Sequence, residues 1–318
     1  MAKTIRDVYG EALLKYGKTN ENVVVLDADV ASSTKSGVFG AACPERFFNV
    51  GIAEANMVGM AAGLATTGKI PFVNTFAVFL TSLGLLGARS FGSYSKLNVK
   101  FMGAYGGISD AYDGPSHHSL EDIAVMRSLP NFQVFVASDE FQTDWLVKNA
   151  IEVNAPMYIR LSRDAMLNFY SMDEKFETGK GKVILEGNDA TIIACGVMVG
   201  QAVEAAKNLA RKGIAVSVID MFCIKPIDKN LILEHAANTG AIITAEEHNI
   251  IGGLGSAVAE VLTANGVIAV QEFVGLNDCH AECGSYAQLL ANYGLDIPSL
   301  EVAINKAISR KKGRFECV

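Results

Sequence analysis

Short runs of apolar, often β-branched residues recur along the chain, and helix-forming stretches separate them. In the first half these runs occupy residues 22–26, 71–74, 97–102, 133–137 and 157–161. A run that is apolar at every position is typical of a strand buried on both faces. Strands that alternate with helices, such as the small-residue stretch 53–65, predict a parallel sheet covered by helices on both sides.

A polar, glycine-containing stretch at 168–187 interrupts this pattern and has the composition of a linker. Strand-like and helical runs then resume, at 190–195, 201–211, 215–220, 228–237, 241–244 and 252–265. We therefore predict an α/β protein with two domains. A doubly wound parallel-sheet domain spans residues 1–178, and a smaller α/β domain spans residues 179–318.

Composition narrows the possible functions. Half of the 318 residues are hydrophobic, which is enough for a large core, and the net charge of −7 argues against binding to nucleic acid. We find no apolar run long enough for a membrane span and no signal-peptide core near the N-terminus. The six cysteines are scattered, and Cys279 and Cys283 lack a second ligand pair for zinc. We expect free thiols and a cytoplasmic location.

One carboxylate, Glu54, stands at the start of the small-residue helix, within the segment 48–60. Two interpretations are open. Glu54 could accept hydrogen bonds from the backbone N–H groups at the helix N-terminus. Alternatively, it could be a buried carboxylate with a raised pKa, able to share a proton with a heterocyclic nitrogen.

Longer motifs decide between them. In order along the chain they are VVLDADVASS, RFFNVGIAEANMVGMAAGLA, IPFVNTFAVF, DGPSHHSLEDIAVMRSLPN, YIRLSR, MFCIKPID and AEEHNIIGGLGSAVAE. In this order and at these distances they resemble the transketolase family, across its pyrimidine-binding domain and its C-terminal domain. The resemblance implies a thiamine-diphosphate-dependent enzyme that transfers a two-carbon ketol unit from a ketose to an aldose.

The resemblance also implies roles for individual residues. Glu54 matches the glutamate that hydrogen-bonds N1′ of the aminopyrimidine, and Phe76 and Phe79 face that ring, with Phe79 stacking on it. Asp29 matches a carboxylate near the cofactor and the subunit contact. From the residues alone, the two phenylalanines could equally be ordinary core packing.

A second group matches the substrate channel. His117 would handle protons of the sugar hydroxyls, whereas His118 has no assigned part. Asp113 would recognise a hydroxyl near the scissile bond. The remaining substrate-binding residues include those that match the site for the sugar's terminal phosphate and one at a position where the family usually has histidine: Ser33, Arg6, Arg163 and Tyr105.

Three features depart from the family pattern. Tyr105 replaces the usual histidine, residues 111–114 replace a Gly-Glu-Asp-Gly stretch, and the segment 80–95 after Phe79 is unusual, with Arg89 as a candidate replacement for a family arginine. These changes surround the expected substrate mouth. They leave open whether the donor is a common sugar phosphate, a branched-chain sugar phosphate or a sulfonated sugar.

The family's Gly-Asp-Gly motif for the diphosphate and its metal does not occur in this sequence. The resemblance therefore implies that an N-terminal-half subunit supplies the ligands for Mg²⁺ or Ca²⁺, with the cofactor between the chains of an α2β2 assembly. We expect no metal ligands in this chain.

Three other functions are compatible with parts of the sequence. The β-subunit of a 2-oxoacid dehydrogenase shares the glutamate and the fold, but DGPSHHS and YIRLSR look more like transketolase. A deoxyxylulose-phosphate synthase is usually a single longer chain. A non-catalytic regulatory subunit would have no need to retain Glu54, Phe79, His117 and Arg163 together.

Overall fold

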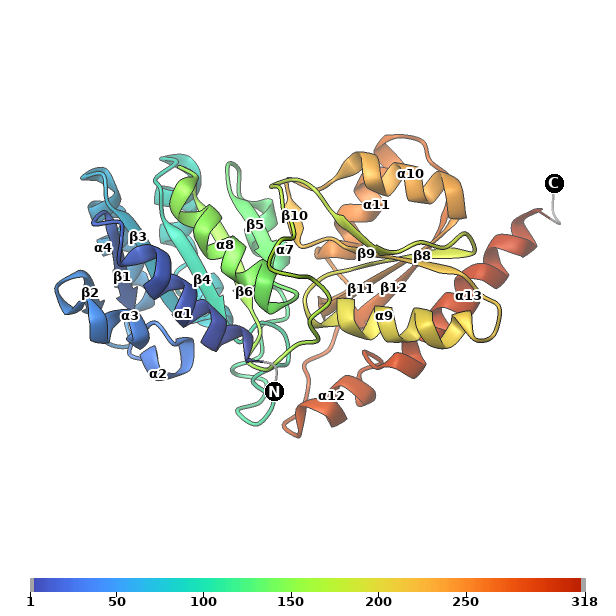
Figure 1. The fold of residues 1–318 in the computed structure, drawn as a ribbon, viewed down its shortest axis with the longest axis horizontal. Coiled ribbons are helices and arrows are strands. Elements are labelled where there is room, and N and C mark those ends of the chain that lie inside the picture. The colour runs from blue at the N-terminus through green and yellow to red at the C-terminus, as the bar shows by residue number, and fades with distance from the viewer. Residues whose placement is uncertain (1–2, 316–318) are drawn as a thin grey trace.

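The computed structural model describes residues 3–315, which form two lobes lying side by side, each built around a sheet (Figure 1). The first sheet has seven strands in the order β10-β5-β6-β4-β3-β1-β2, and the second has five in the order β12-β11-β8-β9-β7. Strands β1 to β6 pair in parallel throughout. Their bounds are Val23–Asp27, Phe47–Asn49, Ile70–Phe76, Lys100–Ala104, Gln133–Val136 and Met157–Leu161.

Helices cover both faces of the first sheet because its strands are apolar on both faces. One face carries α1 (Ile5–Gly17), α3 (Gly37–Ala42) and α8 (Glu140–Glu152). The other carries α4 (Glu54–Thr66), α5 (Ala77–Ser82) and α7 (Asp122–Ser128). The short segments that join these elements are α2 (Ala31–Thr34), η1 (Pro44–Arg46), α6 (Leu85–Gly87) and η2 (Ala88–Tyr94).

Several helices begin where a short polar side chain caps the first turn. Thr4 accepts a hydrogen bond from the backbone N–H of Asp7 at α1, and Asp139 does the same for Gln142 at α8. Such a side chain satisfies one of the N–H groups that lack a partner within the helix. These two side chains therefore mark the starts of α1 and α8.

The second lobe has the same layered plan. Its strands are β7 (Lys182–Leu185), β8 (Ala190–Ala194), β9 (Val216–Asp220), β11 (Ala241–Asn249) and β12 (Val270–Leu276). Buried residues of α9, α12 and α13 gather in one core cluster, and those of α10 and α11 in another. These helices are α9 (Val197–Ala210), α10 (Lys229–Thr239), α11 (Leu254–Ala264), α12 (Tyr286–Asn292) and α13 (Ile297–Phe315).

The two lobes are joined by more than a linker. Strand β10 (Cys223–Lys225) follows β9 in the chain but pairs antiparallel with β5, at the edge of the first sheet. A single hydrophobic core also runs from Val73 and Phe101 in the first lobe to Ile193 and Leu254 in the second. The second lobe therefore supplies an edge strand to the first sheet and part of the hydrophobic core beside it.

Two buried polar groups sit at this joint. Asp220 at the end of β9 accepts hydrogen bonds from Ser138, Gln142 and Tyr170, each at 2.8 Å. Burial raises the pKa of Asp220 to about 7. Arg160 of β6 lies 2.9 Å from the Asp122 carboxylate through Nε.

The predicted fold class and layered α/β plan are confirmed, although several boundaries differ. The strand expected over 97–102 begins at Lys100, and the helix expected over 201–211 begins at Val197. The stretch 168–187 contains β7, because residues 182–185 pair with β9. The division at residues 178 and 179 remains a prediction. None of the helices within residues 3–315 is long and apolar enough to cross a membrane.

Candidate active site

The predicted site residues follow the carboxyl ends of the parallel strands. Phe76 is the last residue of β3, Tyr105 directly follows β4, and Arg163 lies two residues after β6. Asp29 lies two residues after β1, and Glu54 begins the helix that follows β2. Carboxyl ends of parallel strands meet at one edge of a sheet, which is where such folds bind ligands.

Glu54 is buried, with 3% of its surface exposed. The Thr75 hydroxyl donates to its Oε1 at 3.1 Å, and no other hydrogen bond to this carboxylate is formed within residues 3–315. The backbone N–H groups of α4 therefore do not satisfy it, so the first interpretation of Glu54 is wrong. One oxygen of a buried carboxylate is left without a protein partner.

Four rings form an aromatic cluster, which we define as Phe76, Phe79, Tyr105 and His117. Phe76 stacks on Tyr105 with 4.7 Å between centroids and 15° between planes. His117 meets Phe79 edge-on at 5.3 Å and Phe76 at 5.8 Å. Phe79 and His117 are only half-buried. The cluster thus combines two buried rings, Phe76 and Tyr105, with two partly accessible ones.

Two arginines flank Tyr105. The guanidinium groups of Arg6 and Arg163 lie 5.5 Å and 5.3 Å from the centre of its ring, a distance at which a cation is attracted to an aromatic face. Arg6 also donates a hydrogen bond to the Tyr105 hydroxyl. Two residues far apart in sequence are thereby held beside one ring.

Asp110 is a further residue of the site, and no sequence motif singled it out. This residue is fully buried and pairs with Arg163, whose Nη1 lies 2.7 Å from Asp110 Oδ1. Burial, and then the nearby Asp113 carboxylate, raise the pKa of Asp110 to about 6, although Arg163 opposes the shift. The available signal was its place just before the unusual segment 111–114, where a lone aspartate resembles an ordinary turn residue.

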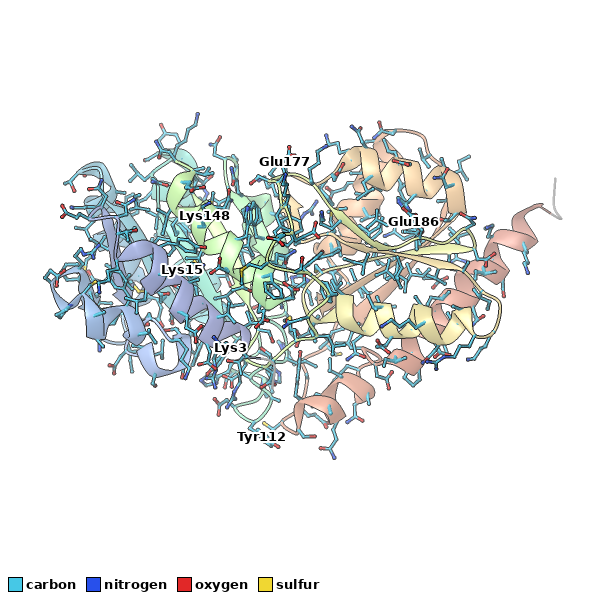
Figure 2. The ribbon with its side chains drawn as sticks, viewed as in Figure 1. Lys3, Lys15, Tyr112, Lys148, Glu177 and Glu186 are labelled. Atoms are coloured by element: carbon cyan, nitrogen blue, oxygen red, sulfur yellow. The ribbon has the colours of Figure 1, made fainter. Side chains whose placement is uncertain are left out.

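Other predicted residues lie at the rim. Asp29 is exposed, has a φ of 66° and accepts a hydrogen bond from Asn49 at 2.7 Å. Ser33 is half-buried in α2. Asp113 is exposed on the loop between β4 and α7, and the neighbouring Tyr112 projects at the outer margin of the molecule (Figure 2). None of these three joins the aromatic cluster in the structure.

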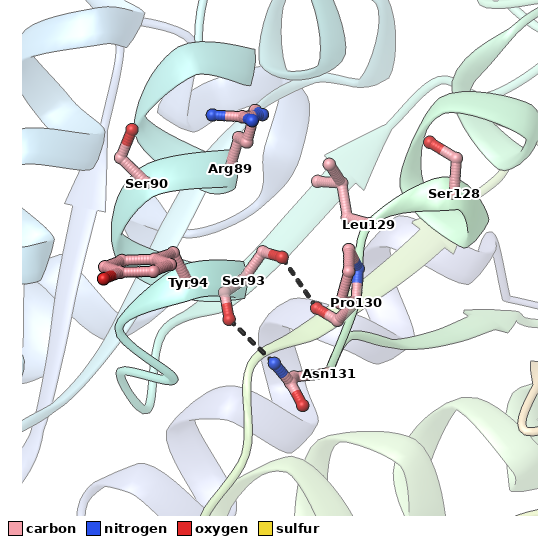
Figure 3. Close-up of a pocket in the computed structure, with 8 residues that line it drawn as sticks. All are labelled: Arg89, Ser90, Ser93, Tyr94, Ser128, Leu129, Pro130 and Asn131. Carbon is pink, nitrogen blue, oxygen red and sulfur yellow. Dashed lines mark hydrogen bonds between the residues drawn. The ribbon is translucent and has the colours of Figure 1, made fainter.

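Arg89 lies elsewhere. It lines an open pocket of about 710 Å³ between η2 and the segment 128–131 that leads into β5 (Figure 3). At this pocket the Ser93 hydroxyl donates to the Pro130 carbonyl oxygen, and the Asn131 amide donates to the Ser93 carbonyl oxygen. Strand β5 starts here, so the pocket lies toward the amino ends of the strands, away from the aromatic cluster. Arg89 therefore does not stand among the other candidates.

The second lobe fixes the loop that carries His117. Gly107 and Ser119 exchange backbone hydrogen bonds of 3.0 Å and 2.9 Å, which closes the loop at its base. The Glu247 carboxylate accepts from the Ile108 N–H at 2.9 Å, and Arg160 donates to the Ser119 and Glu247 carbonyl oxygens. The position of His117 consequently depends on contacts from β11 as well as from its own domain.

The geometry can hold a flat heteroaromatic group. A buried carboxylate with an unpartnered oxygen suits a ring nitrogen that carries a proton. The partly accessible faces of Phe79 and His117 suit an aromatic ring. Within the part of the chain that the structure describes, no group of three or more His, Cys, Asp or Glu residues is arranged to hold a metal ion.

Comparisons with known proteins agree with this geometry. The profile described as Transketolase, pyrimidine binding domain, matches residues 1–167, and that described as Transketolase, C-terminal domain, matches residues 179–300. The chain therefore belongs to the transketolase family, whose members depend on thiamine diphosphate.

The relatives define the kind of subunit. A putative transketolase C-terminal section of Methanocaldococcus jannaschii is 42% identical, over 97% of this chain and 98% of its own length. A 6-deoxy-6-sulfo-D-fructose transketolase subunit of a Clostridium species is 37% identical, over 98% and 96%. A solved split-gene transketolase, described as an inactive beta4 tetramer, is 48% identical with a TM-score of 0.88, over 98% and 100%. This chain is likewise the C-terminal subunit of a two-chain transketolase.

Proposed function

We propose that this subunit controls the proton on the cofactor's aminopyrimidine while a two-carbon ketol unit passes from a ketose to an aldose. The observation that carries the proposal is Glu54, a buried carboxylate with one hydrogen bond from Thr75 and one free oxygen. When bound, thiamine diphosphate would supply a thiazolium carbon acidic enough to lose its proton and so become a nucleophile toward a ketose carbonyl. Glu54 would hold a proton at N1′ of the aminopyrimidine, and burial makes that hydrogen bond stronger than it would be in water.

The aromatic cluster orients the ring. Phe79 is half-buried and lies 5.9 Å from Phe76 between centroids, so its exposed face is free to stack on an aminopyrimidine. Phe76 is held from behind by Tyr105. Because these aromatic rings exclude water, they would strengthen the hydrogen bond between Glu54 and the aminopyrimidine.

His117 and Asp113 would act on the sugar. His117 projects from the loop that the second lobe fixes, and its half-buried ring contacts Phe79. Imidazole can accept or donate a proton near neutral pH, which suits the movement of hydroxyl protons. Asp113, exposed on the same loop, would accept a hydrogen bond from a hydroxyl near the bond that breaks.

The terminal anion of the sugar would bind beside Tyr105. Arg6 and Arg163 flank Tyr105 there, and Ser33 would add a hydroxyl donor. The planar guanidinium group offers paired, charge-assisted hydrogen bonds to an oxyanion.

Helix α4 offers a surface for the partner. Gly59 and Gly63 lie one turn apart, and a side chain added at either would meet nothing within 4 Å. Met60 between them is exposed, as are Ile52 before the helix and Leu86 in the adjoining α6. A second chain could approach this apolar, small-residue face closely. We propose that it is an N-terminal-half subunit in an α2β2 heterotetramer.

That partner would also hold Mg²⁺ or Ca²⁺ together with the diphosphate, because the family's Gly-Asp-Gly motif does not occur in this sequence. The five cysteines within residues 3–315 are free thiols, and this supports a cytoplasmic location for the assembly.

The test is the assembled enzyme with Glu54→Gln. We expect ketol transfer to fall by at least about a thousandfold, because glutamine cannot carry the proton. Calorimetry of thiamine diphosphate with the assembly should show weaker binding, and circular dichroism should show an unchanged fold. Glu21→Gln is the matched control, since Glu21 is exposed before β1 at the opposite edge of the sheet.

Near-normal turnover of Glu54→Gln would refute the assignment. Assays with a ketose phosphate and an aldose, set against pyruvate with an electron acceptor, separate transketolase from a 2-oxoacid dehydrogenase. Light scattering of the chain with and without its partner tests the α2β2 assembly, and full activity of the lone chain would overturn it.

A further inference from the structure

We call Arg6, Arg163 and Ser33 the terminal-anion site, because they are proposed to bind the terminal anion of the sugar. A negative charge that this function does not require lies beside it. Asp110 is fully buried, and its Oδ1 pairs with Arg163 at 2.7 Å. Its Oδ2 is also buried and has no hydrogen-bond partner among residues 3–315. Because Asp113 follows three residues later on the same loop, a second carboxylate lies near the first.

The charges around Tyr105 therefore partly cancel. Arg6 and Arg163 each bring one positive charge close to the ring. Asp110 neutralises one of them, since a carboxylate and a guanidinium in contact form a charge-assisted pair. The site retains less positive charge than two free arginines would offer.

We propose that Asp110 sets the preference of this site among sugars, disfavouring a doubly charged terminal group such as a phosphate dianion and favouring a singly charged one such as a sulfonate. This inference rests on the proposed function, because it assigns the arginines to the terminal group. The physical reason is Coulombic. A fixed negative charge repels a dianion twice as strongly as a monoanion at the same distance.

A purely structural role for Asp110 makes a different prediction. If the carboxylate only held Arg163 in place, its removal would weaken the binding of every anionic sugar equally. If Asp110 were too far from the anion to matter, its removal would change neither. Only a charge effect alters the ratio between the two classes of anion.

The first experiment uses Asp110→Asn, which retains an oxygen acceptor for Arg163 but removes the charge. In the assembled enzyme, KM is measured for a ketose phosphate above pH 7.5, for the corresponding sulfonate and for the uncharged ketose. We expect KM for the phosphate to fall roughly tenfold. KM for the sulfonate should fall roughly threefold, and that for the uncharged ketose should stay within about twofold. Asp144→Asn is the control, because it also removes a carboxylate from an ion pair, in this case with Lys15 on the surface.

The second experiment does not depend on turnover. Side-chain NMR signals of Arg6 and Arg163 in the full chain are titrated with inorganic phosphate and with methanesulfonate. In Asp110→Asn, the apparent affinity for phosphate should rise roughly threefold relative to that for methanesulfonate, because the gain is roughly tenfold for the dianion and threefold for the monoanion.

The outcomes are distinct. A shift in the phosphate-to-sulfonate ratio toward phosphate supports the inference. An equal loss for both anions, or a ratio unchanged within about twofold, overturns it. If the wild-type assembly transfers no ketol unit, the proposed function fails, and the NMR ratio still decides the effect of Asp110. If Asp110→Asn does not fold, Asp110→Ser is used in the same two measurements.

Discussion

Replacing Arg160 with leucine should destabilise the whole chain, because this side chain joins the two lobes. Arg160 is 4% exposed, and its Nε lies 2.9 Å from Asp122 Oδ2. Its Nη2 donates to the carbonyl oxygens of Ser119 at 3.0 Å and Glu247 at 2.7 Å. Leucine fills much of the volume but provides none of these contacts.

The size of the effect follows from what remains behind. Asp122 is fully buried, so the variant would contain a buried carboxylate whose charged partner is gone, although the Tyr158 hydroxyl still donates to it at 2.6 Å. Breaking a buried ion pair by removing one member costs about 3–5 kcal/mol. With a urea slope of about 3 kcal/mol per M, the unfolding midpoint should fall by at least about 1 M.

Urea unfolding followed by tryptophan fluorescence measures this directly. Trp145 is the one tryptophan in the sequence, and it meets Phe222 of the second lobe edge-on at 5.8 Å, so its emission reports the joint. The double variant Arg160→Leu with Asp122→Asn removes the isolated charge and should recover at least about 1 kcal/mol. A loss below about 1 kcal/mol in the single variant, or no recovery in the double variant, would refute the reasoning.

Two further predictions concern a loop and a titration. Gly114 has a φ of 79°, and a side chain there would overlap the Cys283 sulfur. Gly114→Ala should therefore lower kcat/KM of the assembly by at least about tenfold, with partial recovery on adding Cys283→Ala. Gly68→Ala, with a φ of 86° but no neighbour within 4 Å, should keep full activity, and equal losses in both alanine variants would contradict this. The pKa of Asp220 is raised to about 7 by burial, so between pH 4 and 7 the native state binds more protons than the unfolded state. As the pH rises across that range, the contribution of Asp220 to the free energy of unfolding falls. The stability of Asp220→Asn relative to the wild type should therefore increase by up to about 1.4 kcal/mol per pH unit. A difference that does not vary with pH in urea titrations would contradict this assignment.

The sequence could predict the layers because burial on both faces leaves a local mark. The run that became β1 is apolar at every position from Val23 to Leu26, and that pattern needs no knowledge of the neighbours. The placement of β10 had no such mark. Its three residues pair with a strand almost ninety positions earlier, and only the tertiary structure determines that partner.

The candidate site divides in the same way. Glu54, Phe76 and Phe79 lie in motifs whose order carries the family resemblance, so each could be named from the sequence. The part of Asp110 could not, because it depends on the approach of Arg163 from a different strand. Neither sequence spacing nor composition can predict an ion pair between residues that are fifty-three positions apart.

The three residues of β10 have a consequence for how this polypeptide can be divided. They shield the outer edge of β5, whose unpaired backbone groups would otherwise be available to any other extended segment. A fragment ending at residue 178 would expose that edge and would be prone to aggregate through pairing of β5 with the same strand of another molecule. Dividing the chain between the lobes would therefore take from the first lobe a strand that covers its edge.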